Sequence, residues 1–182
     1  MNEHALQYME VFWNTYINQY KLFLFQTIDG HEPTGELIGH FDKILYKFLH
    51  KFYNKGYFKN TVLLFFSDHG QHLPGPLYLF NSQDFFIERA LPTLFLLVPN
   101  DERLYKDNLY EKIKNNQQIF ITAFDIYNTL IHLAFGEKSE EYKRYSSSYG
   151  NSLLSELNYR KRYCESPIYE SQINKLSCSC QL

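Results

Sequence analysis

Residues 61–70 read Thr61-Val-Leu-Leu-Phe-Phe-Ser-Asp-His-Gly70, and this run decides the fold class. Its apolar part does not alternate with polar residues, which predicts a strand buried on both faces. In open α/β sheets, ligands bind just beyond the carboxyl ends of such strands. Asp68 and His69 occupy that position, and Gly70 permits a sharp exit of the chain.

Asp68 and His69 are a candidate ligand pair for a metal ion. A carboxylate is a hard ligand and an imidazole a borderline one, and both suit zinc or manganese. The alternative is a strand that ends in a polar turn, in which Asp68 caps the backbone that follows. One strand end by itself is compatible with both interpretations.

The residues before this strand predict a βαβ unit. Lys21 to Ile28 is an apolar run that predicts a strand. Apolar residues at helical spacing then run from Leu37 to Phe52, with Thr34 as the expected N-cap and Gly56 as the stop. A helix between two strands predicts that the strands are parallel.

Parallel strands end at the same edge of a sheet, so polar residues at both ends are expected to meet. We therefore expect Asp29 and His31 to lie beside Asp68 and His69. His31 is a candidate metal ligand, whereas Asp29 could join it or simply form a turn. His72 is a candidate substrate contact or third ligand, and the alternative is a loop histidine bonded to the backbone.

The rest of the chain predicts alternating helices and strands. A helix is expected over residues 5–19, a strand from Leu91 to Val98, and helices over 104–114 and 122–136. The polar residues from Glu137 to Tyr149 predict a mobile surface segment. We expect residues 1–150 to form the α/β domain and residues 151–182 to form a cysteine-containing tail packed on it.

Several polar residues within the predicted helices have no predicted chemistry. His40, His50 and His132 are expected to pack or to face solvent. Asp125 follows Thr122 in a first helical turn, where a carboxylate is favoured by the helix dipole.

The composition restricts the classes of function. The 182 residues suit one domain or a large part of one, and the 16 Tyr and 16 Phe supply ample core material. A net charge of −2 gives no electrostatic basis for binding nucleic acid or an anionic membrane surface. The residues after Met1 show neither a basic region nor an apolar run of the kind found in export signals.

The three cysteines point to a different cellular setting. Cys164, Cys178 and Cys180 lie within the last 19 residues, in a polar tail, as is typical of disulfide bonding in an oxidising compartment. The alternatives are unpaired thiols in a reducing compartment or a zinc site, although the Cys-Ser-Cys spacing is tighter than zinc sites use. An odd number leaves one cysteine without a partner in this chain. Together with the missing export signal, the tail suggests a chain truncated at its N-terminus.

Several segments, in order, resemble the alkaline phosphatase and sulfatase superfamily, and more narrowly an uncharacterised eukaryotic sulfatase-like branch of it. The segment from Asn60 to Gly70 looks like the second metal-binding segment of that superfamily. The resemblance continues through further segments of the chain. These are Ile87-Glu-Arg-Ala-Leu-Pro92, Ile121-Thr-Ala-Phe-Asp-Ile-Tyr-Asn-Thr-Leu130, Gly150-Asn-Ser-Leu-Leu-Ser-Glu156 and Cys178-Ser-Cys180.

The resemblance implies an α/β/α sandwich with a partly parallel sheet flanked by helices, of which this chain is an incomplete domain. It implies a metal-dependent hydrolase or transferase acting on sulfate or phosphate esters, with a divalent zinc, calcium or manganese ion. Asp68 and His69 would hold one metal, and His31 would hold a second metal or contact the substrate. The complete protein would be extracellular or lumenal, meeting a membrane only through regions absent here.

The nucleophile that the resemblance implies lies in an N-terminal half that this sequence does not contain. Cys164-Glu-Ser-Pro167 differs in spacing from the sulfatase signature and is interpreted as structural. The chain is therefore expected to be the C-terminal half of an enzyme, without turnover by itself. The alternatives are a secreted or lumenal binding protein that keeps the fold without the chemistry, and an unrelated cytosolic α/β domain.

Overall fold

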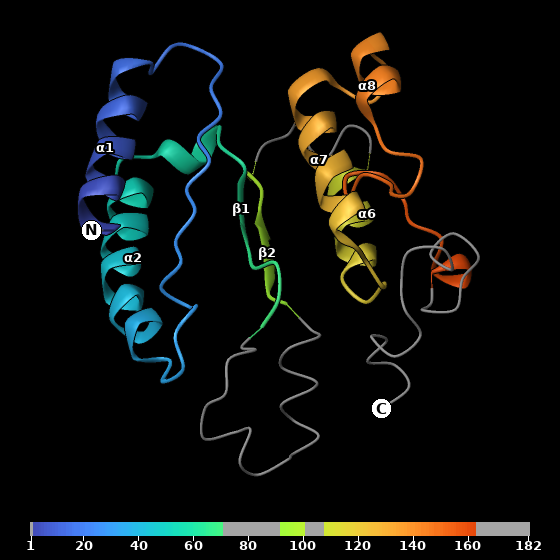
Figure 1. Ribbon diagram of the computed structural model, residues 1–182. Coiled ribbons are helices and arrows are strands. Elements are labelled where there is room, and N and C mark those ends of the chain that lie inside the picture. The colour runs from blue at the N-terminus through green and yellow to red at the C-terminus, as the bar shows by residue number, and fades with distance from the viewer. Residues whose placement is uncertain (1, 71–91, 101–107, 163–182) are drawn as a thin grey trace.

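The computed structural model describes residues 2–70, 92–100 and 108–162, and in it two short strands lie between two groups of helices (Figure 1). The first group is α1 (Asn2–Thr15) and α2 (Glu36–Asn54), and the second includes α6 (Leu109–Asn116) and α7 (Ala123–Phe135). The strands are β1 (Leu63–Phe66) and β2 (Leu94–Leu97). The remaining elements are α8 (Glu140–Tyr145) and the 3₁₀ turns η1 (Tyr57–Lys59) and η2 (Tyr159–Lys161). The described fold is thus mixed α and β.

The sheet in the described residues is an antiparallel pair. β1 pairs with β2, and Phe65 lies opposite Phe95. The pairing extends past the strand ends, because the Ser67 N–H donates to the Thr93 carbonyl and the Thr93 N–H donates to Ser67 Oγ, both at 3.0 Å. These bonds fix the backbone immediately before Asp68.

The prediction of a strand from Lys21 to Ile28 is wrong for this structure, because the segment is extended but belongs to no strand ladder. Side-chain packing holds it instead: Phe23 lies against Phe12 of α1 with ring centroids 5.4 Å apart. The residues on either side of Phe23 point away from the helices: Leu22 and Leu24 are 76% and 75% exposed. In Figure 1 the segment runs in the same direction as β1, with α2 connecting them in the chain.

The predicted burial of β1 on both faces is also wrong for the described residues. Phe65 and Phe66 are each 41% exposed, and neighbouring residues of a strand point to opposite faces. Each face of β1 therefore retains apolar surface that no described element covers.

The N-terminus of α2 begins one residue later than predicted. Its N-cap is Gly35, with φ 73°, and not Thr34. The carboxylate of Glu32 accepts the Thr34 N–H at 2.8 Å and the Leu37 N–H at 3.3 Å, so it takes over the bonding that a capping hydroxyl would supply. The hydrogen bonds from Thr34 hold the pKa of Glu32 below its usual value. At the other end Gly56, with φ 72°, follows the helix as predicted.

Helices α1 and α2 are joined by one carboxylate and one aromatic pair. Glu10 accepts hydrogen bonds from Lys51 and Lys55, each at 2.7 Å. The pKa of Glu10 is lowered, mainly by the hydrogen bond from Lys51 and then by the bond from Lys55. Trp13 packs on the buried Phe52 with ring centroids 5.9 Å apart.

The second group of helices contains one confirmed prediction and one helix that was not predicted. Thr122 caps α7 as predicted, and Asp125 completes a capping box with it. The segment from Glu137 to Tyr149, predicted to be a mobile surface segment, lies at the surface and contains α8, which was not predicted. The cause is local: Ser139 Oγ accepts the Tyr142 N–H at 2.9 Å, which satisfies a donor in the first turn.

Within the described ranges, the buried apolar residues form two groups. One lies between α1 and α2, and the other lies where residues 150–157 cross α6 and α7; they are Leu6, Phe41 and Phe52, and Leu153, Leu154 and Leu157. Among the described helices, none combines the length and apolar composition needed to span a membrane.

Candidate metal centre

Asp68 and His69 lie directly after the last backbone pairing of the sheet. Their side chains are 85% and 45% exposed, so both are accessible from solvent. Asp68 Oδ1 accepts the backbone N–H of His69 at 3.0 Å, which fixes the carboxylate relative to the turn. Its other oxygen, Oδ2, lies 3.7 Å from His69 Nε2.

The second ring nitrogen of His69 determines what Nε2 can do. Nδ1 lies 2.7 Å from the carbonyl oxygen of Gly70. A carbonyl can only accept, so Nδ1 carries the hydrogen and, in the neutral ring, Nε2 carries the lone pair. A backbone carbonyl on the far nitrogen is the arrangement that orients metal-binding histidines.

The spacing of the two donor atoms fits a shared metal ion. Two ligands of one zinc ion lie no more than about 4.2 Å apart, because each zinc bond is about 2.1 Å long. The separation of 3.7 Å between Asp68 Oδ2 and His69 Nε2 is within that range. The pair therefore fits two positions of a divalent metal site.

The loop that contains His31 lies at the same end of the molecule as the end of β1 (Figure 1). The backbone N–H of His31 donates to the carbonyl of Ile28 at 2.9 Å. Asp29, the other candidate in this loop, accepts a hydrogen bond from the side chain of Asn2, and its N–H donates to Thr27 Oγ1 at 3.2 Å. The loop aspartate is thus bonded to α1 and to its own turn.

No three His, Cys, Asp or Glu side chains form a metal-binding group within residues 2–70, 92–100 and 108–162. The described part of the candidate centre is therefore the pair Asp68 and His69. His72 and the cysteines Cys164, Cys178 and Cys180 lie outside the described residues.

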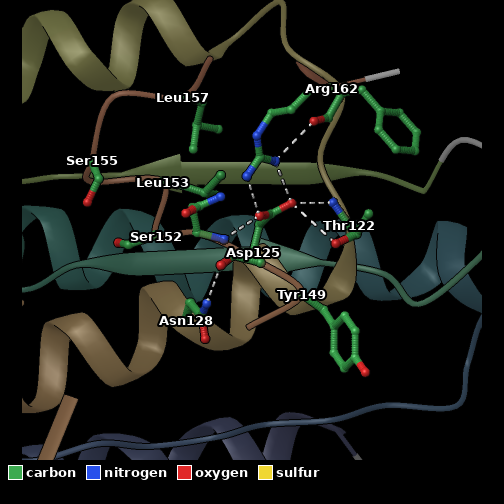
Figure 2. A network of polar contacts seen from close by, with 12 residues as sticks. Thr122, Asp125, Asn128, Tyr149, Ser152, Leu153, Ser155, Leu157 and Arg162 are labelled. Atoms are coloured by element: carbon green, nitrogen blue, oxygen red, sulfur yellow. Dashed lines mark hydrogen bonds and ion pairs between the residues drawn. The ribbon is translucent and has the colours of Figure 1, made fainter. Parts of the chain in front are cut away.

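A buried polar network near the C-terminal end of the described chain was not predicted (Figure 2). Asp125 and Arg162 form a two-point ion pair with both N···O distances at 2.9 Å, and their side chains are 0% and 3% exposed. Asp125 also accepts the backbone N–H groups of Thr122 and Asn151, each at 2.7 Å. Arg162 donates in addition to the Phe120 carbonyl at 3.3 Å. Both carboxylate oxygens of Asp125 and both terminal nitrogens of Arg162 are thereby engaged in holding the chain together.

Asp125 belongs to a polar stripe on α7, which consists of Asp125, Asn128, Thr129 and His132. These positions have spacings of three and four residues, so they lie on one face of the helix. Asp125, Asn128 and Thr129 are buried. The stripe is the sequence signal that could have revealed the network, since polar residues at helical spacing on an apolar helix require buried partners.

The partner of the polar stripe is the strap, defined as residues 147–157. Asn128 donates to the carbonyls of Ser147 and Gly150 at 2.9 and 2.7 Å, and Thr129 Oγ1 accepts the Leu153 N–H at 2.8 Å. These bonds satisfy backbone groups of a segment that has no regular secondary structure. The stripe therefore positions the strap, whereas Asp68 and His69 are exposed to solvent.

Comparison with known families identifies one match. The family model described as "Protein of unknown function (DUF229)" matches residues 1–182. Neither the curated proteins nor the solved structures include a match. Since the match spans the whole chain, the protein belongs to the DUF229 family.

Proposed function

We propose that this chain carries the metal-binding segment of a hydrolase that acts on sulfate or phosphate esters. The observation that carries the proposal is the pair Asp68 and His69 at the end of β1, with Oδ2 and Nε2 3.7 Å apart. The bond between His69 Nδ1 and the Gly70 carbonyl supports it, because it directs the lone pair of the ring to Nε2.

The arrangement of elements supports the proposed α/β/α sandwich of this superfamily. Helices lie on both sides of the strands, and residues 21–28 run in the same direction as β1 (Figure 1). A further strand beside residues 21–28 would turn that extended segment into part of a sheet and produce the partly parallel order.

In this proposal Asp68 and His69 hold a divalent ion, with zinc or manganese favoured over calcium because imidazole is a ligand. When bound, such an ion neutralises charge on the ester oxygens and on the leaving oxygen. His31 is proposed as a ligand of a second ion or a contact to the substrate, and His72 as a substrate contact. We assign the nucleophile to none of these residues.

The cysteines suggest where the protein works. Cys164, Cys178 and Cys180 are proposed to form disulfides, which require an oxidising compartment outside the cell or in the lumen of the secretory pathway. The proposed partner is a sulfate or phosphate ester. The net charge of −2 gives no support to nucleic acid as a partner.

The decisive measurement is metal affinity. We expect Asp68→Asn and His69→Gln each to weaken binding of zinc or manganese by at least the roughly 10–100-fold that losing an outer-shell partner costs. Titration calorimetry and elemental analysis of the protein containing this chain provide the readout. The matched controls are Asp42→Asn and His40→Gln, because both residues are exposed on α2.

The outcomes separate binding from chemistry. Unchanged affinity in both site variants, equal to that of the α2 controls, would contradict the metal site. Metal loss in the site variants together with loss of aryl sulfate or aryl phosphate hydrolysis would support the full proposal. Metal binding at Asp68 and His69 without turnover of either ester would retain the site and contradict the hydrolase.

A further inference from the structure

Two adjacent residues in the middle of the strap are held to α7 by different chemistry. Asn151 donates its N–H to Asp125 in the first turn of α7, and the charge of Asp125 is matched by Arg162. Ser152 contacts His132, which lies in the last turn of α7. A guanidinium keeps its charge throughout the physiological pH range, whereas an imidazole does not. The second contact therefore contains the side chain whose charge changes near neutral pH.

The hydroxyl of Ser152 can donate to His132 only when the ring is neutral. His132 Nδ1 lies 2.9 Å from Ser152 Oγ, and Ser152 is completely buried. Ser152 Oγ already accepts the Leu154 N–H at 3.2 Å. A neutral Nδ1 provides the acceptor for the serine hydroxyl hydrogen. A protonated ring has two donors and no acceptor, so its Nδ1–H could only donate to Oγ and the buried hydroxyl hydrogen would lose its acceptor.

The groups around His132 come from three other parts of the chain. The ring of Tyr142 from α8 stands edge-on at 5.7 Å between centroids. Glu137, which accepts from Ser155 Oγ at 2.6 Å, favours the charged ring, while Lys112 of α6 disfavours it. Burial is the largest influence, and the pKa of His132 is lowered below its usual value.

We propose that His132 and Ser152 form an acid-sensitive latch, which holds the strap closed on α7 at neutral pH and releases it in weak acid. The sign follows from linkage. Since the folded-state pKa is lower than the unfolded-state value of about 6.5, the closed strap is fully stabilised above that pH. The stabilisation is lost as the pH falls through the folded-state value.

Opening of the latch would uncover apolar surface. Leu153, Leu154 and Leu157 are buried where the strap crosses α6 and α7. Asn116 of α6 holds this part through the carbonyls of Leu153 and Ser155, at 2.9 and 2.8 Å. The bonds of Asp125 to Asn151 and to Arg162 would keep the chain attached before and after the latch, so acid would loosen the strap locally while the fold persists.

Hydrogen exchange measures the latch directly. We compare exchange of the full chain at about pH 7.5 and about pH 5, the range in which histidine changes charge, corrected for the intrinsic pH dependence of exchange. The amides of Leu153 and Leu154 should lose protection in acid, by about tenfold for each unit by which burial lowers the pKa. Amides of α2 should show no comparable change.

Two variants and one titration separate the latch from general acid sensitivity. His132→Gln should abolish the acid-dependent loss in the strap, whereas the exposed control His40→Gln should retain it. The nuclear magnetic resonance midpoint of the His132 ring in the wild type should coincide with the loss of protection at Leu153, which keeps the test valid if His132→Gln does not fold. Strap protection that is independent of pH, or an unchanged acid response in His132→Gln, would overturn the proposal. A titration midpoint of the His132 ring that differs from the pH at which Leu153 loses protection would also overturn it.

Discussion

Asp125 and Arg162 form an ion pair that is almost wholly shielded from water. The two-point geometry and the additional bonds from Thr122 and Asn151 satisfy the carboxylate completely enough for it to be buried as an ion. The pair connects the first turn of α7 to residue 162, and so it joins segments that are distant in the sequence. Its contribution depends on both partners being present.

We predict that Arg162→Ala destabilises the fold by about 3–5 kcal/mol, because the substitution leaves a buried carboxylate without its counter-ion. Urea unfolding followed by circular dichroism provides the measurement. Arg160→Ala is the control: Arg160 is exposed and stacks on Tyr159, so its loss should cost less than about 1 kcal/mol. Equal losses in the two variants would show that the ion pair has no special role.

At the scale of single residues, the candidate metal ligands could be identified from the sequence, whereas the buried polar network around Asp125 could not. Asp68 and His69 could be predicted because the chemistry is carried by adjacent residues at a strand end. The partners of Asp125 could not be predicted, because Asn151 and Arg162 lie 26 and 37 residues away in the chain and are positioned by the path of the strap. Local sequence indicated only the capping box with Thr122, which the structure confirms.

Alanine substitutions at two glycines are expected to change the stability of the fold in opposite directions. Gly39 lies inside α2, and a Cβ at this position would meet no atom within 4 Å. We expect Gly39→Ala to stabilise the fold by about 0.5–1 kcal/mol through the helix propensity of alanine. At Gly150, in the strap, a Cβ would lie 2.5 Å from the carbonyl carbon of Phe124. Gly150→Ala should therefore destabilise by about 1–3 kcal/mol or more.

Thermal unfolding of both glycine variants provides the measurement, with each variant serving as the control for the other. The reason for the difference is that the strap backbone approaches the first turn of α7 so closely that only hydrogen fits. A stabilising Gly150→Ala would mean that the strap does not lie against α7 as described. The proposed latch at His132 depends on the same close packing.

Helices were more predictable than strand pairing. The apolar spacing of α2 and α7, with Gly56 and Thr122 at their ends, indicated both helices because the signals are local. The pairing of strands depends on residues far apart in the chain. Residues 21–28 were expected to be the parallel partner of β1, whereas the described partner is β2, which is antiparallel. α8 was missed because its six residues are too few for an apolar period, and its cap at Ser139 was the remaining signal.

The described fold leaves an unusual amount of apolar surface on the extended segment 21–28. Leu22, Leu24 and Ile28 point away from α1 and are at least three-quarters exposed. Their backbone also belongs to no strand ladder. An extended apolar segment that belongs to no strand ladder is a template for association with another strand.

We predict that this chain, expressed as these 182 residues, self-associates and that Leu24→Lys weakens the association by roughly tenfold or more. The estimate follows from the free energy of burying one leucine side chain, about 1.5–3 kcal/mol. Sedimentation at several concentrations measures the effect. Val11→Lys adds the same charge at an exposed position of α1 and should change the association less. A chain that remains monomeric at all concentrations would contradict the prediction.

The class of the fold as a mixture of helices and strands could be predicted from hydrophobic periodicity, and the family match spans the whole chain. The arrangement of the strands could not be predicted from the sequence. Residues 21–28 have a strand-like pattern, but they can join a sheet only where a neighbouring strand pairs with them. The sequence pattern describes what a segment is suited to, whereas pairing depends on which partners are present.

The separation of Asp125 and Arg162 also has a consequence for synthesis on the ribosome. Translation adds about 5–20 residues per second, so the guanidinium is made about 2–7 seconds after the carboxylate it will neutralise. During that interval Asp125 can already cap α7 through Thr122, since that partner precedes it in the chain. We therefore expect α7 to form early during synthesis with its polar stripe still hydrated, and the stripe to lose its water only when the strap and Arg162 emerge.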